Sequence, residues 1–162
     1  NGGAGGDTLT GNGGGDEFVF DAANESGVDG SSGIDGSTGK PSTIDELTDN
    51  NIDVITDMNF DSDTIDFTLF AEQPNNLNTG VDTNGGHTVA DGDASLLTAI
   101  DGTDVQVGSA NDAGDRYLVF NDSGSDISAT GNLNPFEADG VALIGLDDAQ
   151  NTGSAGTADF AS

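Results

Sequence analysis

Two consecutive nine-residue units near the start of the chain share one pattern of glycine, aspartate and apolar residues. Residues 2–10 read GGAGGDTLT, and residues 11–19 read GNGGGDEFV. Both units fit G-G-x-G-x-D-x-U-x, where U is a large apolar residue, except that Asn12 replaces a glycine in the second unit. In a flexible glycine-rich linker, nothing would maintain aspartate and apolar residues at a nine-residue spacing. The spacing therefore predicts a folded, repeating coil.

The order of residue types within each unit predicts a tight turn followed by a short strand. Glycine permits positive φ and close backbone approach, which a tight turn requires. Residues of the following strand alternate between two faces, so Leu9 and Phe18 are expected to point into one core. Stacked turns would bring backbone carbonyls together with the carboxylates of Asp7 and Asp16, and such an all-oxygen site is typical of calcium.

The charge balance of the chain calls for a positive partner. Acidic residues number 30 against two basic ones, the formal net charge is −28, and only 33% of the residues are hydrophobic. A chain with this profile does not stay collapsed unaided, so metal cations, a basic partner or high salt must neutralise it. The same charge excludes nucleic acid and anionic membrane surfaces as partners, and no apolar run is long enough for membrane insertion. Because the chain has no cysteine, disulfides cannot stabilise it.

The chain resembles the C-terminal region of RTX proteins, the hemolysin-type calcium-binding proteins that leave bacteria by type I secretion. Beyond the repeats, the resemblance covers DVITDMNFDSDTIDF (residues 53–67), DRYLVFNDSGSD, GVALIGLDDA and the final ADFAS, which is similar to the end of a type I secretion signal. It implies an all-β fold, in which the end of a calcium-binding parallel β-roll is followed by an antiparallel β C-terminal capping region.

The resemblance also implies a set of calcium ligands. Each aspartate at position six of a unit acts with the carbonyls of positions one to four, and acidic residues after Phe20 are candidates to close the site. The expected ligands are Gly2, Gly3, Ala4, Gly5, Asp7, Gly11, Asn12, Gly13, Gly14, Asp16, Asp53, Asp57, Asp63 and Asp66.

Four regions are expected along the chain. Residues 1–20 form the β-roll repeats, which are expected to be cut inside a longer array, and residues 21–52 form an acidic Gly/Ser-rich loop insertion. Residues 53–115 supply capping strands and loops, with DVITDMNF and DTIDFTLF as two strands. Residues 116–162 supply the C-terminal strands, RYLVF and VALIGL, with the type I secretion signal. Two segments stay open: STIDEL fits a capped helix or a surface turn, and SLLTAI fits a strand or a helix.

No motif in the sequence indicates catalysis. His87 is the only histidine and is expected in a surface loop, H-E-x-x-H and G-x-S-x-G do not occur, and the acidic turns DSD, DGD and NDSGSD do not complete an EF-hand. These turns are either looser calcium ligands or solvated loops.

Together with these observations, the resemblance implies a non-catalytic, extracellular (secreted or cell-surface) module that folds on binding calcium. Its expected partners are calcium ions, the type I secretion machinery and, through self-assembly or polysaccharide binding, the cell surface. The parent protein is expected to be an S-layer protein, adhesin or filament, and the alternative is the tail of a secreted hydrolase (metalloprotease or lipase) or a hemolysin-type toxin. The acidic surface of a halophile would explain the charge but not the nine-residue phase.

Overall fold

A computed structural model describes residues 1–21, 25–26, 51–67, 74–82, 87–100, 103–104, 116–129, 136, 140–147 and 155–160. Within these ranges the regular elements are eleven strands and one 3-10 turn, which confirms the all-β class. No helix in the described part of the chain is long and apolar enough to cross a membrane. The elements are β1 (Thr8–Leu9), β2 (Glu17–Val19), β3 (Asp53–Ile55), β4 (Thr64–Asp66), β5 (Leu77–Asp82), β6 (His87–Val89), β7 (Ala94–Ile100), β8 (Thr103–Asp104), β9 (Arg116–Asn121), β10 (Ile127–Ala129), β11 (Val141–Leu146) and the 3-10 turn η4 (Thr157–Asp159).

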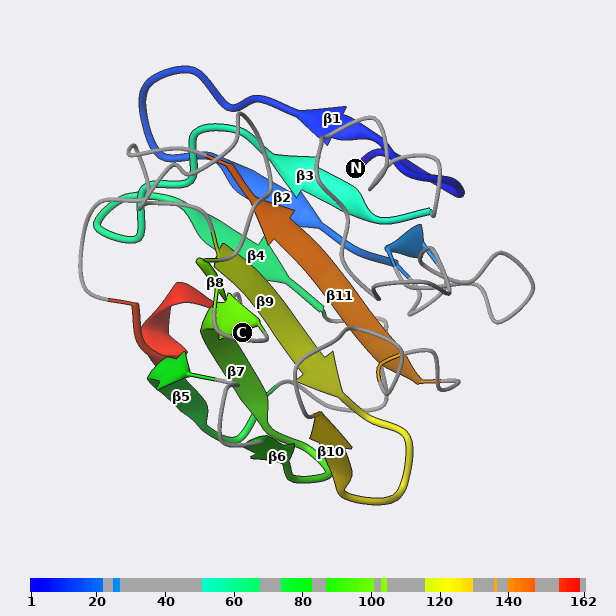
Figure 1. The fold of residues 1–162 in the computed structure, drawn as a ribbon. Coiled ribbons are helices and arrows are strands. Elements are labelled where there is room, and N and C mark those ends of the chain that lie inside the picture. The colour runs from blue at the N-terminus through cyan, green and yellow to red at the C-terminus, as the bar shows by residue number, and fades with distance from the viewer. Residues whose placement is uncertain are drawn as a thin grey trace.

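The largest sheet combines parallel and antiparallel pairs. Its strands run in the order β1-β3-β11-β9-β7-β5, and β8 also pairs with β7 (Figure 1). β9 lies antiparallel between β11 and β7, whereas the β1–β3, β3–β11 and β5–β7 pairs are parallel. The strands predicted at RYLVF and VALIGL are confirmed as β9 and β11, and SLLTAI lies in strand β7 rather than in a helix.

The strands β1 and β2 follow one another along the chain but lie in different sheets. In β1, Thr8 pairs in parallel with Val54 of β3, and in β2, Phe18 pairs in parallel with Ile65 of β4. The chain therefore follows the same path twice, and we call residues 1–20 the first coil and residues 51–67 the second coil. Residues 53–67, which the sequence places among the capping strands, supply β3 and β4, and these pair in parallel with β1 and β2.

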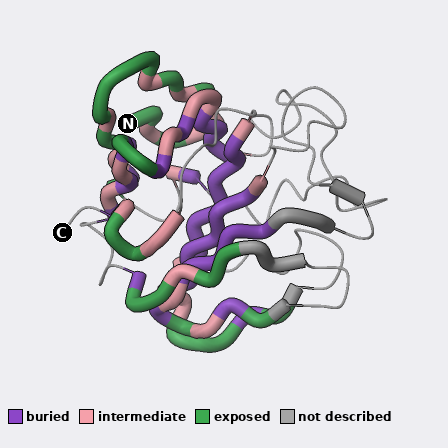
Figure 2. Tube along the Cα trace, turned by 90° about the vertical axis from the view of Figure 1, so that its left-hand side faces the viewer, coloured by how far each residue is buried: buried purple, intermediate pink, exposed green. Residues whose placement is uncertain are grey.

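The apolar core lies on both faces of the large sheet. Leu118 and Phe120 of β9 pack into the cluster between this sheet and the β2–β4 pair, whereas Tyr117 and Val119 pack into a second cluster on the opposite face. The central strands are buried along their length (Figure 2), which explains why VALIGL shows no polar–apolar alternation.

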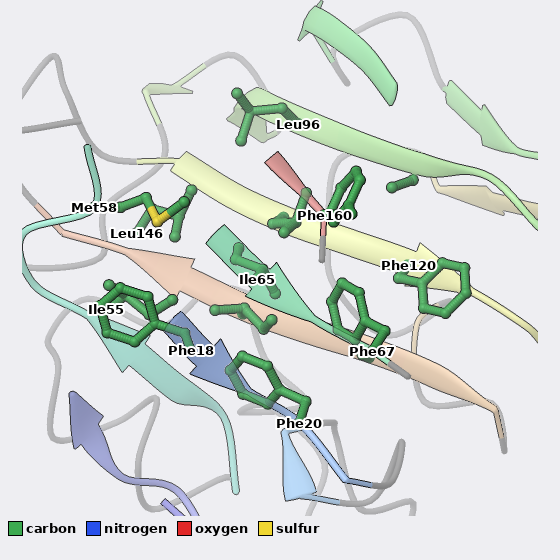
Figure 3. Packing of buried hydrophobic residues seen from close by; sticks show 14 of the residues in the cluster. Phe18, Phe20, Ile55, Met58, Ile65, Phe67, Leu96, Phe120, Leu146 and Phe160 are labelled. Atoms are coloured by element: carbon green, nitrogen blue, oxygen red, sulfur yellow. The ribbon is translucent and has the colours of Figure 1, made fainter. Parts of the chain in front are cut away.

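The first cluster brings the two coils into contact with the antiparallel strands. Phe18 is buried in it (Figure 3). Leu9 packs against it, as the nine-residue phase predicted. The expected strands in DVITDMNF and DTIDFTLF are present as β3 and β4, but each covers only three residues, and they lie in different sheets.

Two further expectations concern single segments. His87 was expected in a surface loop; it instead begins β6, where it pairs with Ala129 of β10. The proposed helix or turn at STIDEL lies outside the described residues.

Candidate cation site in the coils

The glycine-rich loops of the first coil share one backbone conformation. In the first loop, positions two and four are Gly3 and Gly5, with φ of +88° and +110°. In the second loop, the same positions are Asn12 and Gly14, with φ of +73° and +133°. Asparagine enters the left-handed region more readily than other residues with a side chain. The one departure from the glycine pattern therefore keeps the conformation of the loop.

Position one of each loop must be glycine because the position-six carboxylate occupies the space beside it. A Cβ atom on Gly2 would lie 2.7 Å from Oδ2 of Asp7, and one on Gly11 would lie 2.8 Å from Oδ2 of Asp16. Each carboxylate thus folds back over the start of its own loop. This arrangement brings a carboxylate oxygen against the backbone of the loop, and a hard, oxygen-binding cation such as calcium suits that donor set.

The aspartates at position six stack on equivalent aspartates of the second coil. The backbone N–H of Asp7 donates to Oδ1 of Asp53 at 2.8 Å, and the N–H of Asp16 donates to Oδ1 of Asp63 at 3.1 Å. The N–H of Val54 donates to the carbonyl of Asp7, and the N–H of Thr64 donates to the carbonyl of Asp16, each at 2.8 Å. Asp53 and Asp63 therefore occupy position six of the second coil.

We call the contact between the second loop and residues 57–63 the closed corner, because backbone N–H groups there satisfy the carboxylate oxygens. Oδ1 and Oδ2 of Asp57 accept the N–H groups of Gly11 and Asn12 at 2.8 and 2.6 Å. Oδ2 of Asp63 accepts the N–H of Asn59 at 2.9 Å. Each oxygen of these two carboxylates therefore already receives a backbone N–H.

The corner between the first loop and β3 leaves one oxygen without a partner, and we call it the open corner. Asp53 is fully buried, and its Oδ2 is the buried side-chain atom without a hydrogen-bond partner in the described part of the chain. The backbone of Asp53 is held firmly: its N–H donates to Oγ of Ser26 at 2.9 Å, and that hydroxyl donates to the carbonyl of Leu143 at 2.6 Å. Asp53 is thus held in place by three segments that are far apart in the sequence, at Asp7, Ser26 and Leu143.

The electrostatics of the open corner disfavour an uncompensated charge. The pKa of Asp53 is raised from 3.8 to about 7 in total: burial is the largest cause, the hydrogen bond from the N–H of Asp7 lowers it, and the negative charges of Asp7 and Glu25 contribute to the rise. A buried carboxylate in this position needs either a proton or a cation. The residues at the open corner therefore fit a cation.

The other expected ligands divide between the two loops and one strand. Gly2, Gly3, Ala4, Gly5, Gly11, Asn12, Gly13 and Gly14 all lie in the loops themselves. Asp53, Asp57 and Asp63 contact the loops through their side chains. Asp66 lies instead along β4, beside Val19, where its carbonyl accepts the N–H of Phe20 at 2.9 Å.

Carboxylates alone do not build a metal centre in the described residues. No group of three or more histidine, cysteine, aspartate or glutamate side chains there is placed to hold a metal ion. A cation at the open corner would need backbone carbonyls as well. The sequence reasoning missed Ser26, which lies in the expected loop insertion, where no local pattern distinguishes it from other serines.

No family model matches the chain, and neither the curated proteins nor the solved structures contain a match to it.

Proposed function

We propose that this chain is a non-catalytic, calcium-binding module of a secreted or cell-surface protein, and that calcium stabilises its fold outside the cell. The observation that carries the proposal is the fully buried Oδ2 of Asp53, which has no hydrogen-bond partner among the described residues. Leaving such a charge uncompensated in the core costs several kcal/mol by order of magnitude, so a counter-charge at this place has a large effect on folding.

The pairing of the strands supports a parallel β-roll as the setting of this site. Consecutive short strands alternate between two sheets, and each pairs in parallel with its equivalent in the next coil. Position six of both coils is an aspartate, and the loops before β1 and β2 share their positive-φ positions. These features agree with what the resemblance to RTX proteins implies.

The charge of the chain supports calcium rather than a basic side chain as the compensating group. Lys40 and Arg116 are the only lysine and arginine in the sequence. The side chain of Arg116 lies over the ring of Phe60, 6.0 Å from its centroid, in the second coil. Asp53 together with Asp7 and loop carbonyls would hold the ion, which would supply two positive charges to the open corner.

The setting of the parent protein belongs to the same proposal. Because calcium is scarce inside a cell, this acidic chain would be only weakly stable before export, which suits type I secretion. Millimolar calcium outside the cell would then stabilise the fold. A surface or matrix protein is the parent we favour, because no catalytic motif occurs in the chain.

The experiment compares Asp53→Asn with Asp63→Asn, since the two aspartates occupy the same position in the two corners. Urea unfolding of each variant and of the unaltered chain is followed by circular dichroism, with 10 mM calcium and without it. For a dissociation constant of about 10⁻⁴ M, calcium adds about 2.7 kcal/mol to the unaltered chain. Asp53→Asn is expected to lose this gain, whereas Asp63→Asn is expected to be less stable in both conditions and to keep it.

Each alternative outcome contradicts a different part of the proposal. No calcium response in the unaltered chain contradicts the function. A response that survives in Asp53→Asn but disappears in Asp63→Asn moves the site to the closed corner. A normal response in both variants shows that the buried Oδ2 of Asp53 holds a proton rather than a cation.

A further inference from the structure

Residues 155–160, which we call the strap, return from the far end of the described sequence to the second coil. Phe160 is only 8% exposed and forms an isolated parallel bridge with Ile65 of β4. Its ring centroid lies 5.8 Å from that of Phe67, and it sits inside the cluster that joins the coils to the antiparallel strands (Figure 3). The strap therefore docks against the second coil at Ile65 and Phe67.

Most polar contacts of the strap lie within the strap itself. Oδ2 of Asp159 accepts the N–H of Gly156 at 2.6 Å, and the N–H of Phe160 donates to the carbonyl of Thr157 at 3.4 Å. Burial raises the pKa of Asp159, and the negative charge of nearby Asp61 adds to this effect. The strap thus brings a carboxylate close to an acidic loop of the second coil, which opposes its docking.

We propose that the strap is a releasable device: it docks through Phe160 once the second coil has formed, and it opens locally while the central sheet stays folded. Local opening is favoured where few contacts tie a segment to its surroundings. In the described residues the strap is held by one bridge, by the side chain of Phe160 and by half-buried Ala155, which packs against the same cluster. Release of the strap exposes the apolar end of the first cluster. The dependence of docking on calcium rests on the proposed function, because the coil is the part that calcium would stabilise.

Thiol labelling at three positions tests this proposal, since the chain contains no cysteine of its own. Ala155→Cys, at a half-buried strap residue that packs against the first cluster, reports opening of the strap while Phe160 is kept; Val119→Cys in β9 reports opening of the central sheet, and exposed Ser125→Cys gives the unprotected rate. With calcium, Ala155→Cys is expected to react more slowly than Ser125→Cys and at least about 10-fold faster than Val119→Cys, and adding Phe160→Ala is expected to raise its rate to that of Ser125→Cys. In chelator, the rate of Ala155→Cys is expected to rise to that of Ser125→Cys while Val119→Cys stays the slowest.

Each other result contradicts one part of the proposal. If Ala155→Cys reacts as fast as Ser125→Cys in calcium, the strap is not docked; if it reacts as slowly as Val119→Cys, the strap has no opening of its own. If the rate of Ala155→Cys is the same in chelator as in calcium, the strap remains and the calcium proposal fails. Hydrogen exchange on the unaltered chain supplies a second comparison: the N–H groups of Asp159 and Phe160 are expected to exchange faster than those of β9 but slower than free peptide.

Discussion

The buried carboxylate of Asp53 makes a pH-dependent contribution to stability that can be measured without calcium. Its pKa is 3.8 in the unfolded chain and about 7 in the folded one. Between these values the folded state binds one proton more than the unfolded state, so the free energy of unfolding falls as the pH rises. The contribution of Asp53 is complete below pH 3.8 and is lost as the pH passes through about 7.

The size of the effect follows from the difference between the two pKa values. That difference is about 3 units, and each unit corresponds to about 1.4 kcal/mol, so the total is about 4 kcal/mol. Domains of this size unfold at a cost of roughly 5–15 kcal/mol, and the loss is therefore a large share of the whole.

Urea unfolding in calcium-free buffer at several pH values between 4 and 8 measures this loss, with Asp53→Asn as the comparison. Asparagine keeps the shape of the side chain but cannot ionise, so the variant retains the general repulsion among the other acids and lacks only the Asp53 contribution. Between pH 5 and 7 the unaltered chain is expected to lose about 1.4 kcal/mol per pH unit more than the variant. Equal slopes for the two proteins would refute the account of the open corner.

Three further experiments test other parts of the structure. Gly2→Ala places a methyl group against the carboxylate of Asp7 at the open corner and is expected to raise the calcium midpoint, whereas Gly13→Ala in the second loop meets no atom within 4 Å and is expected to leave it unchanged; calcium titration by circular dichroism compares them. Asn121→Ala removes a fully buried amide that bonds to four backbone and hydroxyl groups, and a loss of about 3 kcal/mol is expected in urea unfolding. Phe67→Ala empties the centre of the first cluster and is expected to cost about 4 kcal/mol; a loss below about 1 kcal/mol in the same assay would mean that this ring is not in the core.

Short-range patterns predicted much of the fold. The nine-residue phase placed Leu9 and Phe18 in one core, and the apolar runs at 116–121 and 141–146 are the two strands buried on both faces. Local sequence also predicted the turn–strand form of the first two units, because glycine and asparagine are the residues that adopt positive φ.

Long-range pairing was beyond these patterns. Nothing local shows that β3 and β4 belong to separate sheets, because a short alternating run fits a hairpin as well as a coil. The two corners differ because the N–H of Asn59 donates to Oδ2 of Asp63, whereas no described residue donates a hydrogen bond to Oδ2 of Asp53. Such differences come from tertiary contacts that spacing does not encode.

The order of strands in the large sheet also governs how fast this chain can fold. Thr8 lies beside Val54, and Asp53 lies beside Ile144, so strands far apart in sequence must meet before the core can close. Chains dominated by such distant pairings fold in roughly milliseconds to seconds, because loop closure costs entropy before any contact repays it. Once every cation site is filled, additional calcium is therefore expected to leave the folding time unchanged. The rate is then limited by the pairing of strands that are far apart in the sequence.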